Sequence, residues 1–198
     1  MLDYFEAQRP QQGLTYEAYL ALWQERLQQP TTGLDRTARR YHFYRTYNWD
    51  RSARVQAAYT LSEALQARLH HLEPQWWMVL TEDWCVDSAF ALPVVAAAAQ
   101  AAPDVKLRIL EREANLDLMD RYLTNGSRSI PVVVAISHDG EERFTWGPRP
   151  RAAQALREAK LAEGVDGAQV AKLVIDYYET GGWGDVDTEL TQLIGRTD

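Results

Sequence analysis

Cysteine is almost absent from this sequence of 198 residues, which has one thiol, Cys85. A single cysteine excludes an internal disulfide, as is typical of proteins from reducing compartments, and limits any thiol chemistry to one sulfur. Basic residues are also scarce relative to acidic ones, with 21 Lys and Arg against 28 Asp and Glu and a net charge of −7. This balance argues against a general polyanion binder, although a local basic patch remains compatible with it.

We also expect no targeting or membrane-spanning segment. The uncharged stretch over residues 88–102 contains Pro93 and is shorter than the ~20 residues that a span needs. The first residues, from Met1 to Glu6, carry acids where a signal peptide has bases. We therefore expect a soluble, cytoplasmic protein without a membrane partner. With 46% hydrophobic and 25% charged residues, the composition is that of a globular chain that needs neither disulfide nor metal to fold.

The first 75 residues carry helical patterns. Apolar side chains recur on one helix face between Tyr16 and Leu27, which predicts a helix over residues 15–29 with Thr15 at its start and Pro30 after its end. Two further helices are predicted over residues 35–47 and 52–72. The apolar faces of these helices are too large to be left in water, so we expect residues 1–75 to pack on the rest of the chain as a helical extension.

The pattern changes at residue 76. Short apolar runs predict strands over residues 76–81, 105–110, 131–136 and 143–146, with helices over 88–101, 116–123 and 150–163. The order β-α-β-α-β-β-α makes the first two strands parallel and the last two an antiparallel hairpin at Asp139-Gly140. This predicts an α/β core over residues 76–163, a mixed four-stranded sheet flanked by helices. Helices over 167–180 and 185–194 would form a C-terminal extension over residues 164–198.

Cys85 is the candidate nucleophile because of where it lies. It follows the first buried strand and precedes the alanine-rich helix, where free backbone N–H groups and the helix dipole stabilise a thiolate. We expect it to be solvent-accessible with a lowered pKa. A buried, inert cysteine is the alternative.

The residues around Cys85 resemble the active site of thioredoxins. Trp84-Cys85-Val86-Asp87-Ser88 is similar to their Trp-Cys-x-x-Cys motif with serine replacing the second cysteine, and Pro93 stands where thioredoxins kink the active-site helix. Ile130-Pro131 is similar to the cis-proline loop. Residues 82–85, 116–120, 128–131 and 146–150 look like those of a bacterial thioredoxin-family branch with a helical N-terminal extension. The resemblance implies a thioredoxin-like fold, with Trp84, Ile130 and Pro131 as substrate-binding residues.

Serine at position 88 departs from the thioredoxin pattern. A dithiol site attacks with one sulfur and releases the mixed disulfide with the other, which a hydroxyl cannot do. Ser88 would instead donate a hydrogen bond to the thiolate or cap the helix. Monothiol exchange through Cys85, with Ser88 as the second catalytic residue, is the leading hypothesis. Glutathione or another small thiol would be the co-substrate, and no resident cofactor is expected. A non-catalytic module that binds a peptide or protein at the cis-proline groove is the alternative.

Other charged residues are candidate modulators of the thiol. Asp83, Asp87 and Glu82 would oppose thiolate formation, while Asp87 could instead cap the helix, and Arg128 lies beside the proline motif. Six arginines and several aromatic residues alternate between Arg36 and Arg54. Helix packing is the simplest explanation for the aromatic residues. A contribution to the thiol site ranks second, and nucleic-acid binding ranks a distant third. The scattered histidines have no spacing typical of a metal site, and we expect none.

Overall fold

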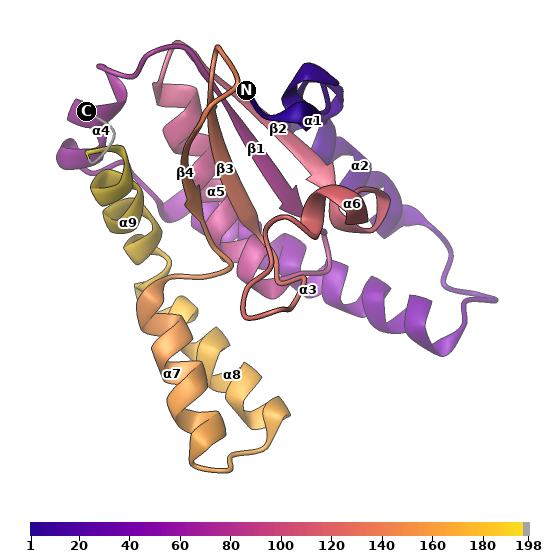
Figure 1. The fold of residues 1–198 in the computed structure, drawn as a ribbon. Helices are drawn as coiled ribbons and strands as arrows, with labels where there is room; N and C mark the ends of the chain where they lie inside the picture. Colours follow the sequence, from indigo (N-terminus) through magenta and orange to yellow (C-terminus); the bar gives the residue numbers. More distant parts are fainter. Residues whose placement is uncertain (196–198) are drawn as a thin grey trace.

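A mixed four-stranded sheet lies at the centre of the computed structural model, which describes residues 1–195 (Figure 1). The strand order is β2-β1-β3-β4. The first βαβ unit is parallel and the last two strands form an antiparallel hairpin, as the element order predicts. The strands are β1 (Gln75–Thr81), β2 (Val105–Glu111), β3 (Val132–Ser137) and β4 (Glu142–Trp146).

Both faces of the sheet are buried, because side chains alternate along β1 and β3 between two apolar clusters. Trp77 and Val79 face the larger cluster, whereas Met78 and Leu80 face the smaller one. Helices cover both sides. The larger cluster is built on α5 (Val86–Ala101), against which three helices pack: α3 (Arg36–Ala58), α4 (Glu63–Leu69) and α9 (Gly184–Ile194).

Short helices close the other face. Tyr4 and Phe5 of α1 (Asp3–Glu6) and Leu118 and Met119 of α6 (Leu116–Met119) belong to the smaller cluster. The predicted helix over residues 116–123 is therefore shorter than expected, because the chain leaves α6 for turns that lead to the Asn125-Gly126 break. Between α6 and β2 lies a 3₁₀ turn, Arg112–Ala114, and another, Pro10–Gln12, follows α1.

The N-terminal helices differ from the prediction in one respect. The helix α2 (Tyr16–Gln28) begins after Thr15, whose side chain accepts a hydrogen bond from Ala18 N, as expected of a cap. However, residues 35–47 and 52–58 form one continuous helix, α3, and the break lies at residues 59–62. Ser62 caps α4 there, and its own N–H and hydroxyl donate to Asp187 of α9. This anchor to a distant helix fixes a break that no proline or glycine marks.

The C-terminal region adds a helical hairpin and a last helix. The hairpin of α7 (Arg151–Ala162) and α8 (Gly167–Tyr177) projects away from the sheet (Figure 1). A π-helical turn, Tyr178–Gly182, then leads into α9, whose Val186, Leu190 and Ile194 lie in the larger cluster. Among residues 1–195, no helix combines the length and the apolar character that crossing a membrane requires.

Replacing Trp23 with alanine should destabilise the whole chain. Trp23 of α2 is buried, packs edge-to-face on Tyr19 and Trp49, and donates from Nε1 to Arg45 O at 3.2 Å. We expect one urea transition with a loss of about 3–5 kcal/mol in the free energy of unfolding, the usual cost of truncating a buried aromatic. Phe43→Ala, on the exposed side of α3, is the control and should change stability by less than about 0.5 kcal/mol. A separate early transition that left the core midpoint unchanged would show that the extension is independent.

Candidate functional site

Cys85 occupies the loop between β1 and α5, at the end of the sheet where the parallel strands terminate. It is the N-cap residue of α5, and its backbone N–H donates to Glu82 O at 3.1 Å. Its thiol donates to the backbone oxygen of Ile130 at 3.3 Å. The strand-to-helix position inferred from the sequence is therefore the one that the structure has, and it brings Cys85 next to the proline loop.

The expected exposure and lowered pKa of Cys85 are both wrong. Cys85 is only 8% exposed and belongs to the smaller apolar cluster with Leu110 and Ile130. Burial raises the pKa of the thiol to about 11, and the neighbouring Asp87 carboxylate adds to this effect. Hydrogen bonds from Ser88 and from the start of α5 act in the opposite direction but do not outweigh burial. At neutral pH the site holds a thiol.

Ser88 does not cap the helix. Because α5 begins at Val86, two residues earlier than predicted, Ser88 lies inside its first turn and is buried. Its hydroxyl oxygen lies 2.6 Å from Oγ1 of Thr81, the last residue of β1, which donates to it. The interaction fastens the helix start to the strand end.

Asp87 does not cap the helix either, because its carboxylate is bound by side chains from the C-terminal region. Its carboxylate accepts two hydrogen bonds from the Arg149 guanidinium, at 3.1 and 2.7 Å, and a third from the Tyr178 hydroxyl at 2.9 Å. Arg149 precedes α7 and Tyr178 follows α8, so the pair joins the C-terminal hairpin to the first turn of α5, next to the thiol. The motif at residues 146–150 is the one sequence signal for Arg149, and nothing in the sequence points to Tyr178.

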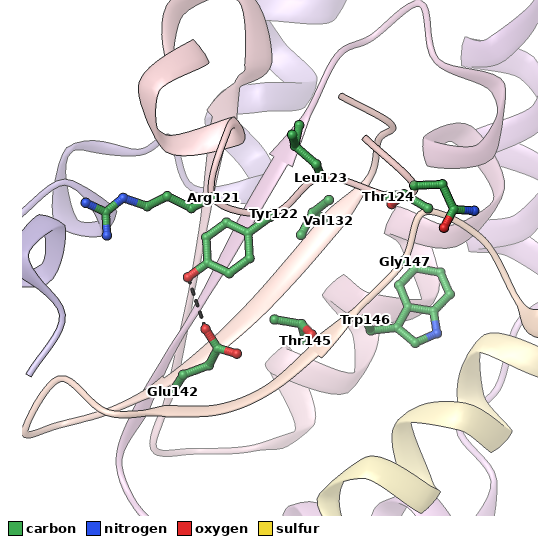
Figure 2. A pocket seen from close by; sticks show the side chains of 10 residues that line it. Arg121, Tyr122, Leu123, Thr124, Val132, Glu142, Thr145, Trp146 and Gly147 are labelled. Carbon is green, nitrogen blue, oxygen red and sulfur yellow. Dashed lines mark hydrogen bonds between the residues drawn. The ribbon is translucent and has the colours of Figure 1, made fainter. Parts of the chain in front are cut away.

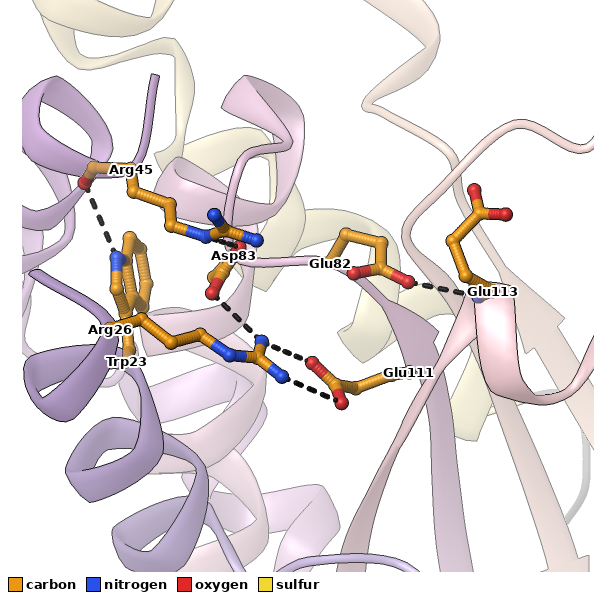
Figure 3. Close-up of polar contacts among 7 residues, drawn as sticks. All are labelled: Trp23, Arg26, Arg45, Glu82, Asp83, Glu111 and Glu113. Atoms are coloured by element: carbon orange, nitrogen blue, oxygen red, sulfur yellow. Dashed lines mark hydrogen bonds and ion pairs between the residues drawn. The ribbon is translucent and has the colours of Figure 1, made fainter. Parts of the chain in front are cut away.

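Asp83, a further acid of the loop, binds partners from the N-terminal helices (Figure 3). Asp83 is buried and accepts from Arg26 Nη1 at 3.0 Å and from Arg45 Nε at 2.6 Å. Arg26 also binds both carboxylate oxygens of Glu111 on β2. Asp83 is thus a structural anchor for α2 and α3.

Glu82 is buried on the other side of the loop. Its carboxylate accepts one hydrogen bond, from the Glu113 N–H at 2.9 Å. Burial is the main cause that raises the pKa of Glu82 to about 7; the Glu113 N–H lowers it, and the neighbouring carboxylates of Glu111, Asp83 and Glu113 raise it. Glu82 therefore changes charge near neutral pH.

Trp84 is held in a stack between two side chains. The Tyr41 ring of α3 lies parallel to it with 4.8 Å between centroids, and the Arg112 guanidinium lies 5.0 Å from its centroid. This places an aromatic of the Arg36–Arg54 stretch directly at the candidate site.

The proline loop lies beside the thiol, but its residues Ile130 and Pro131 are not exposed to solvent. The Ile130–Pro131 peptide bond is cis, and both residues are buried. Arg128 points elsewhere: its guanidinium makes two hydrogen bonds to the Asp120 carboxylate, at 2.6 and 2.8 Å, on the exposed side of the loop. Its side chain does not contact Cys85 among the interactions of residues 1–195.

An apolar groove of about 700 Å³ opens at Cys85. We call it the α3–α8 groove. Its walls are the exposed side of α3, from Arg40 to Arg51, the residues Trp84, Cys85 and Val86, and Ala171 and Ile175 of α8. Three of its aromatic side chains are largely exposed: Phe43 at 54%, Tyr44 at 40% and Tyr47 at 50%. For these three, the expectation that the aromatics of the stretch serve helix packing is wrong, and they line the thiol site instead.

A second cavity, of about 530 Å³, lies over β3 and β4 and the loop after α6 (Figure 2). Its lining is mostly polar, and Tyr122 donates to Glu142 across it at 3.1 Å. Asn125 lies at its edge. Neither Cys85 nor Trp84 belongs to this cavity. Within residues 1–195, no three histidine, cysteine or acidic side chains gather in a way that could hold a metal ion.

The fold and the site define a protein of thioredoxin-type architecture with one buried thiol at the start of α5. A thioredoxin family model matches residues 36–162, more than half of the chain, so the protein belongs to the thioredoxin-like family. A protein of unknown function from Pseudomonas aeruginosa has a similar structure, with 20% identity over 100% of both chains and a TM-score of 0.65. An HIV epitope-scaffold is also similar, with 19% identity over 92% of this chain and 98% of its own and a TM-score of 0.57. No curated protein matches.

Glu82→Gln should stabilise the protein above neutral pH. The folded-state pKa of about 7 exceeds the ordinary value of 4.5, so the wild-type free energy of unfolding should fall as pH rises from about 4.5 through 7. Glutamine keeps an oxygen for the Glu113 N–H without the buried charge. At pH 8 we expect a gain of about 3 kcal/mol, because about 1.4 kcal/mol per pH unit applies over the interval between the two values.

Urea unfolding at pH 5 and pH 8 measures this difference. Glu158→Gln, on the exposed side of α7, is the matched control and should change stability equally little at both pH values. A Glu82→Gln variant that is less stable than wild type at pH 8 would contradict the assignment of a costly buried carboxylate.

Proposed function

We propose that the protein binds a ligand in the α3–α8 groove, with Trp84 and the protonated Cys85 thiol among the groups that contact it. The groove itself carries this proposal: its volume of about 700 Å³ lies within the range of small-molecule sites, and it has an apolar lining. Phe43, Tyr44 and Tyr47 expose their rings side by side, an arrangement that typically marks a binding surface.

The state of the thiol favours binding over catalysis. With a pKa of about 11, roughly one Cys85 in ten thousand would be thiolate at pH 7, and the thiolate is the reactive form. Asp83 and Asp87, which flank Cys85 in the sequence, are both engaged in ion pairs with arginines. Recognition would take place in the helical groove, because Ile130 and Pro131 are buried rather than open to an extended peptide.

Monothiol exchange is the second candidate, and the position of Cys85 in the wall of the groove favours it. The Cys85 thiol would lose its proton, and its sulfur would attack one sulfur of a ligand disulfide. The other ligand sulfur would leave as a thiolate and take up the proton. Since Ser88 cannot break the resulting mixed disulfide, an external thiol such as glutathione would have to release the ligand.

A neutral fluorescent probe tests the binding proposal. N-phenyl-1-naphthylamine should bind the wild-type protein with a rise in fluorescence, because its rings replace water on the exposed aromatics. Tyr47→Ala should weaken binding by about tenfold, the usual effect of removing a large apolar contact from a pocket. Leu161→Ala, which removes an exposed side chain of α7 outside the groove, is the control and should bind as wild type does. Equal binding by wild type and Tyr47→Ala would place the probe elsewhere and refute the groove.

The pH dependence of Cys85 alkylation separates the two candidates. For the binding protein, the rate of reaction with iodoacetamide should rise tenfold per pH unit up to about pH 11, following the thiolate fraction. The wild-type protein should also fail to catalyse insulin reduction by dithiothreitol. An alkylation midpoint near pH 7, together with a gain of insulin reduction in Ser88→Cys, would instead support exchange chemistry.

A further inference from the structure

One buried hydrogen-bond donor in the α3–α8 groove has no protein partner. Asn48 is 1% exposed, and its Nδ2 is one of three buried side-chain atoms among residues 1–195 that make no hydrogen bond, with Gln11 Oε1 and Tyr19 OH. Of these three residues, Asn48 lines the groove. A buried donor without an acceptor is costly and rare in a folded chain, and a bound ligand is one explanation for it.

The orientation of the Asn48 amide is fixed by its neighbour. Arg51 Nη1 lies 3.0 Å from Asn48 Oδ1 and donates to it. A guanidinium has no acceptor, so the oxygen must face Arg51 and the NH₂ group must face the other way. The unpaired group of Asn48, a residue that lines the groove, is therefore a donor.

Cations accompany this donor along the same side of α3. Arg40, Tyr44, Tyr47, Asn48 and Arg51 recur at helical spacing, so they form one stripe that faces the groove. Arg40 makes no ion pair among residues 1–195, and its guanidinium lies near the Tyr41 and Tyr44 rings, 5.8 and 6.0 Å from their centroids.

The Arg51 charge is only partly balanced. Its Nε lies 3.6 Å from the Glu179 carboxylate, which makes a closer bond of 2.7 Å to Arg54. At the Arg51 end of the stripe, a guanidinium and an amide donor thus lie together beside apolar rings. Both groups are hydrogen-bond donors that would bind an oxygen acceptor, and the guanidinium binds a negatively charged acceptor more strongly than a neutral one.

We propose that the α3–α8 groove binds a small amphipathic carboxylate, with its apolar chain on Tyr44 and Tyr47 and its carboxylate oxygens on Asn48 Nδ2 and Arg51. This inference rests on the proposed ligand-binding function and names the ligand class. Because Asn48 is almost completely buried, a narrow terminal group of a ligand could reach it but the surface of a folded protein could not. The groove volume is also that of a small-molecule site. Although the protein has a net charge of −7, the two arginines of this stripe give it the charge that complements an anion.

A series of ligands with one chain length separates the roles of charge and apolar body. Dodecanoate, dodecanol and dodecyltrimethylammonium, each below its micelle concentration at pH 8, are titrated by calorimetry against the full chain. We expect dodecanoate to bind at least tenfold more tightly than dodecanol, and dodecyltrimethylammonium to bind more weakly than both. Acetate, which has the charge without the chain, should not bind measurably.

Asn48→Leu tests the donor. It should lower the affinity for dodecanoate about tenfold while leaving the affinity for dodecanol unchanged. The unfolding temperature should change little, because removing the unpaired buried donor offsets the loss of the oxygen that accepts from Arg51. Arg36→Gln, which changes a cation of α3 outside the groove, is the matched control and should keep the wild-type preference. Should Asn48→Leu fail to fold, Asn48→Asp keeps the Arg51 partner and should lose still more dodecanoate affinity by repulsion.

Each outcome has a defined meaning. Equal affinity of the wild-type protein for dodecanoate and dodecanol would overturn the carboxylate inference but not the proposal that the groove binds a ligand. The same conclusion would follow if both Asn48 variants kept the wild-type preference for dodecanoate over dodecanol. No binding by any chain compound would overturn both. Sedimentation that shows a dimer, with dimer formation abolished by Phe43→Ala, would show that a second copy covers the groove and would overturn the small-ligand inference.

Discussion

The buried carboxylate of Asp83 holds the N-terminal helices against the thiol loop. It accepts hydrogen bonds from Arg26 of α2 and Arg45 of α3, and Arg26 continues to Glu111 of β2. Four elements therefore meet through one charge that has no exposed surface. An unpaired buried charge costs far more free energy than a paired one, so Asp83 depends on its two arginine partners, Arg26 and Arg45, to be stable when buried. The position of α3, and with it the stack of Tyr41 on Trp84 and one wall of the α3–α8 groove, follows from this anchor.

The thiol state results from the same packing. A helix N-terminus alone would lower the pKa of Cys85, but the apolar neighbours of the sulfur and the carboxylate of Asp87 outweigh the dipole. Arg149 and Tyr178 bind Asp87 and so bring the C-terminal hairpin to the site. The two helical extensions that form the walls of the groove are thus each joined by a buried carboxylate to the loop that carries the thiol. A neutral thiol in an apolar groove is suited to recognition.

Much of the core could be predicted from the sequence, because its signals are local. The apolar run at Trp76 to Thr81 and the β-α-β-α-β-β-α order define the sheet, and the resemblance at Trp84 to Ser88 leads to the thiol. The burial of Cys85 could not be predicted in this way, since it depends on Ile130, 45 residues away. The side chains that bind Asp83 and Asp87 lie 38 to 91 residues away in the sequence.

The aromatic residues of the Arg36–Arg54 stretch show the same limit. Their spacing indicates a helix but does not show which side of the helix is buried, and burial of all the aromatic rings by helix packing is the simplest interpretation. The structure turns Trp49 toward Trp23 and leaves Phe43 and Tyr47 in the groove wall. Asn48 carries no sequence signal at all, because an unpaired donor is recognised only when its neighbours are known.

The side-chain amide of Asn48 offers the most direct measurement of the central claim. The chain has three asparagines, and Asn48 lines the α3–α8 groove, Asn125 the polar cavity over β3 and β4, and Asn115 neither. In a protein labelled with ¹⁵N-asparagine, addition of dodecanoate should shift the Asn48 NH₂ resonances and leave those of Asn115 and Asn125 in place. A shift at Asn125 with Asn48 unchanged would contradict the account, because it would place the ligand in the other cavity.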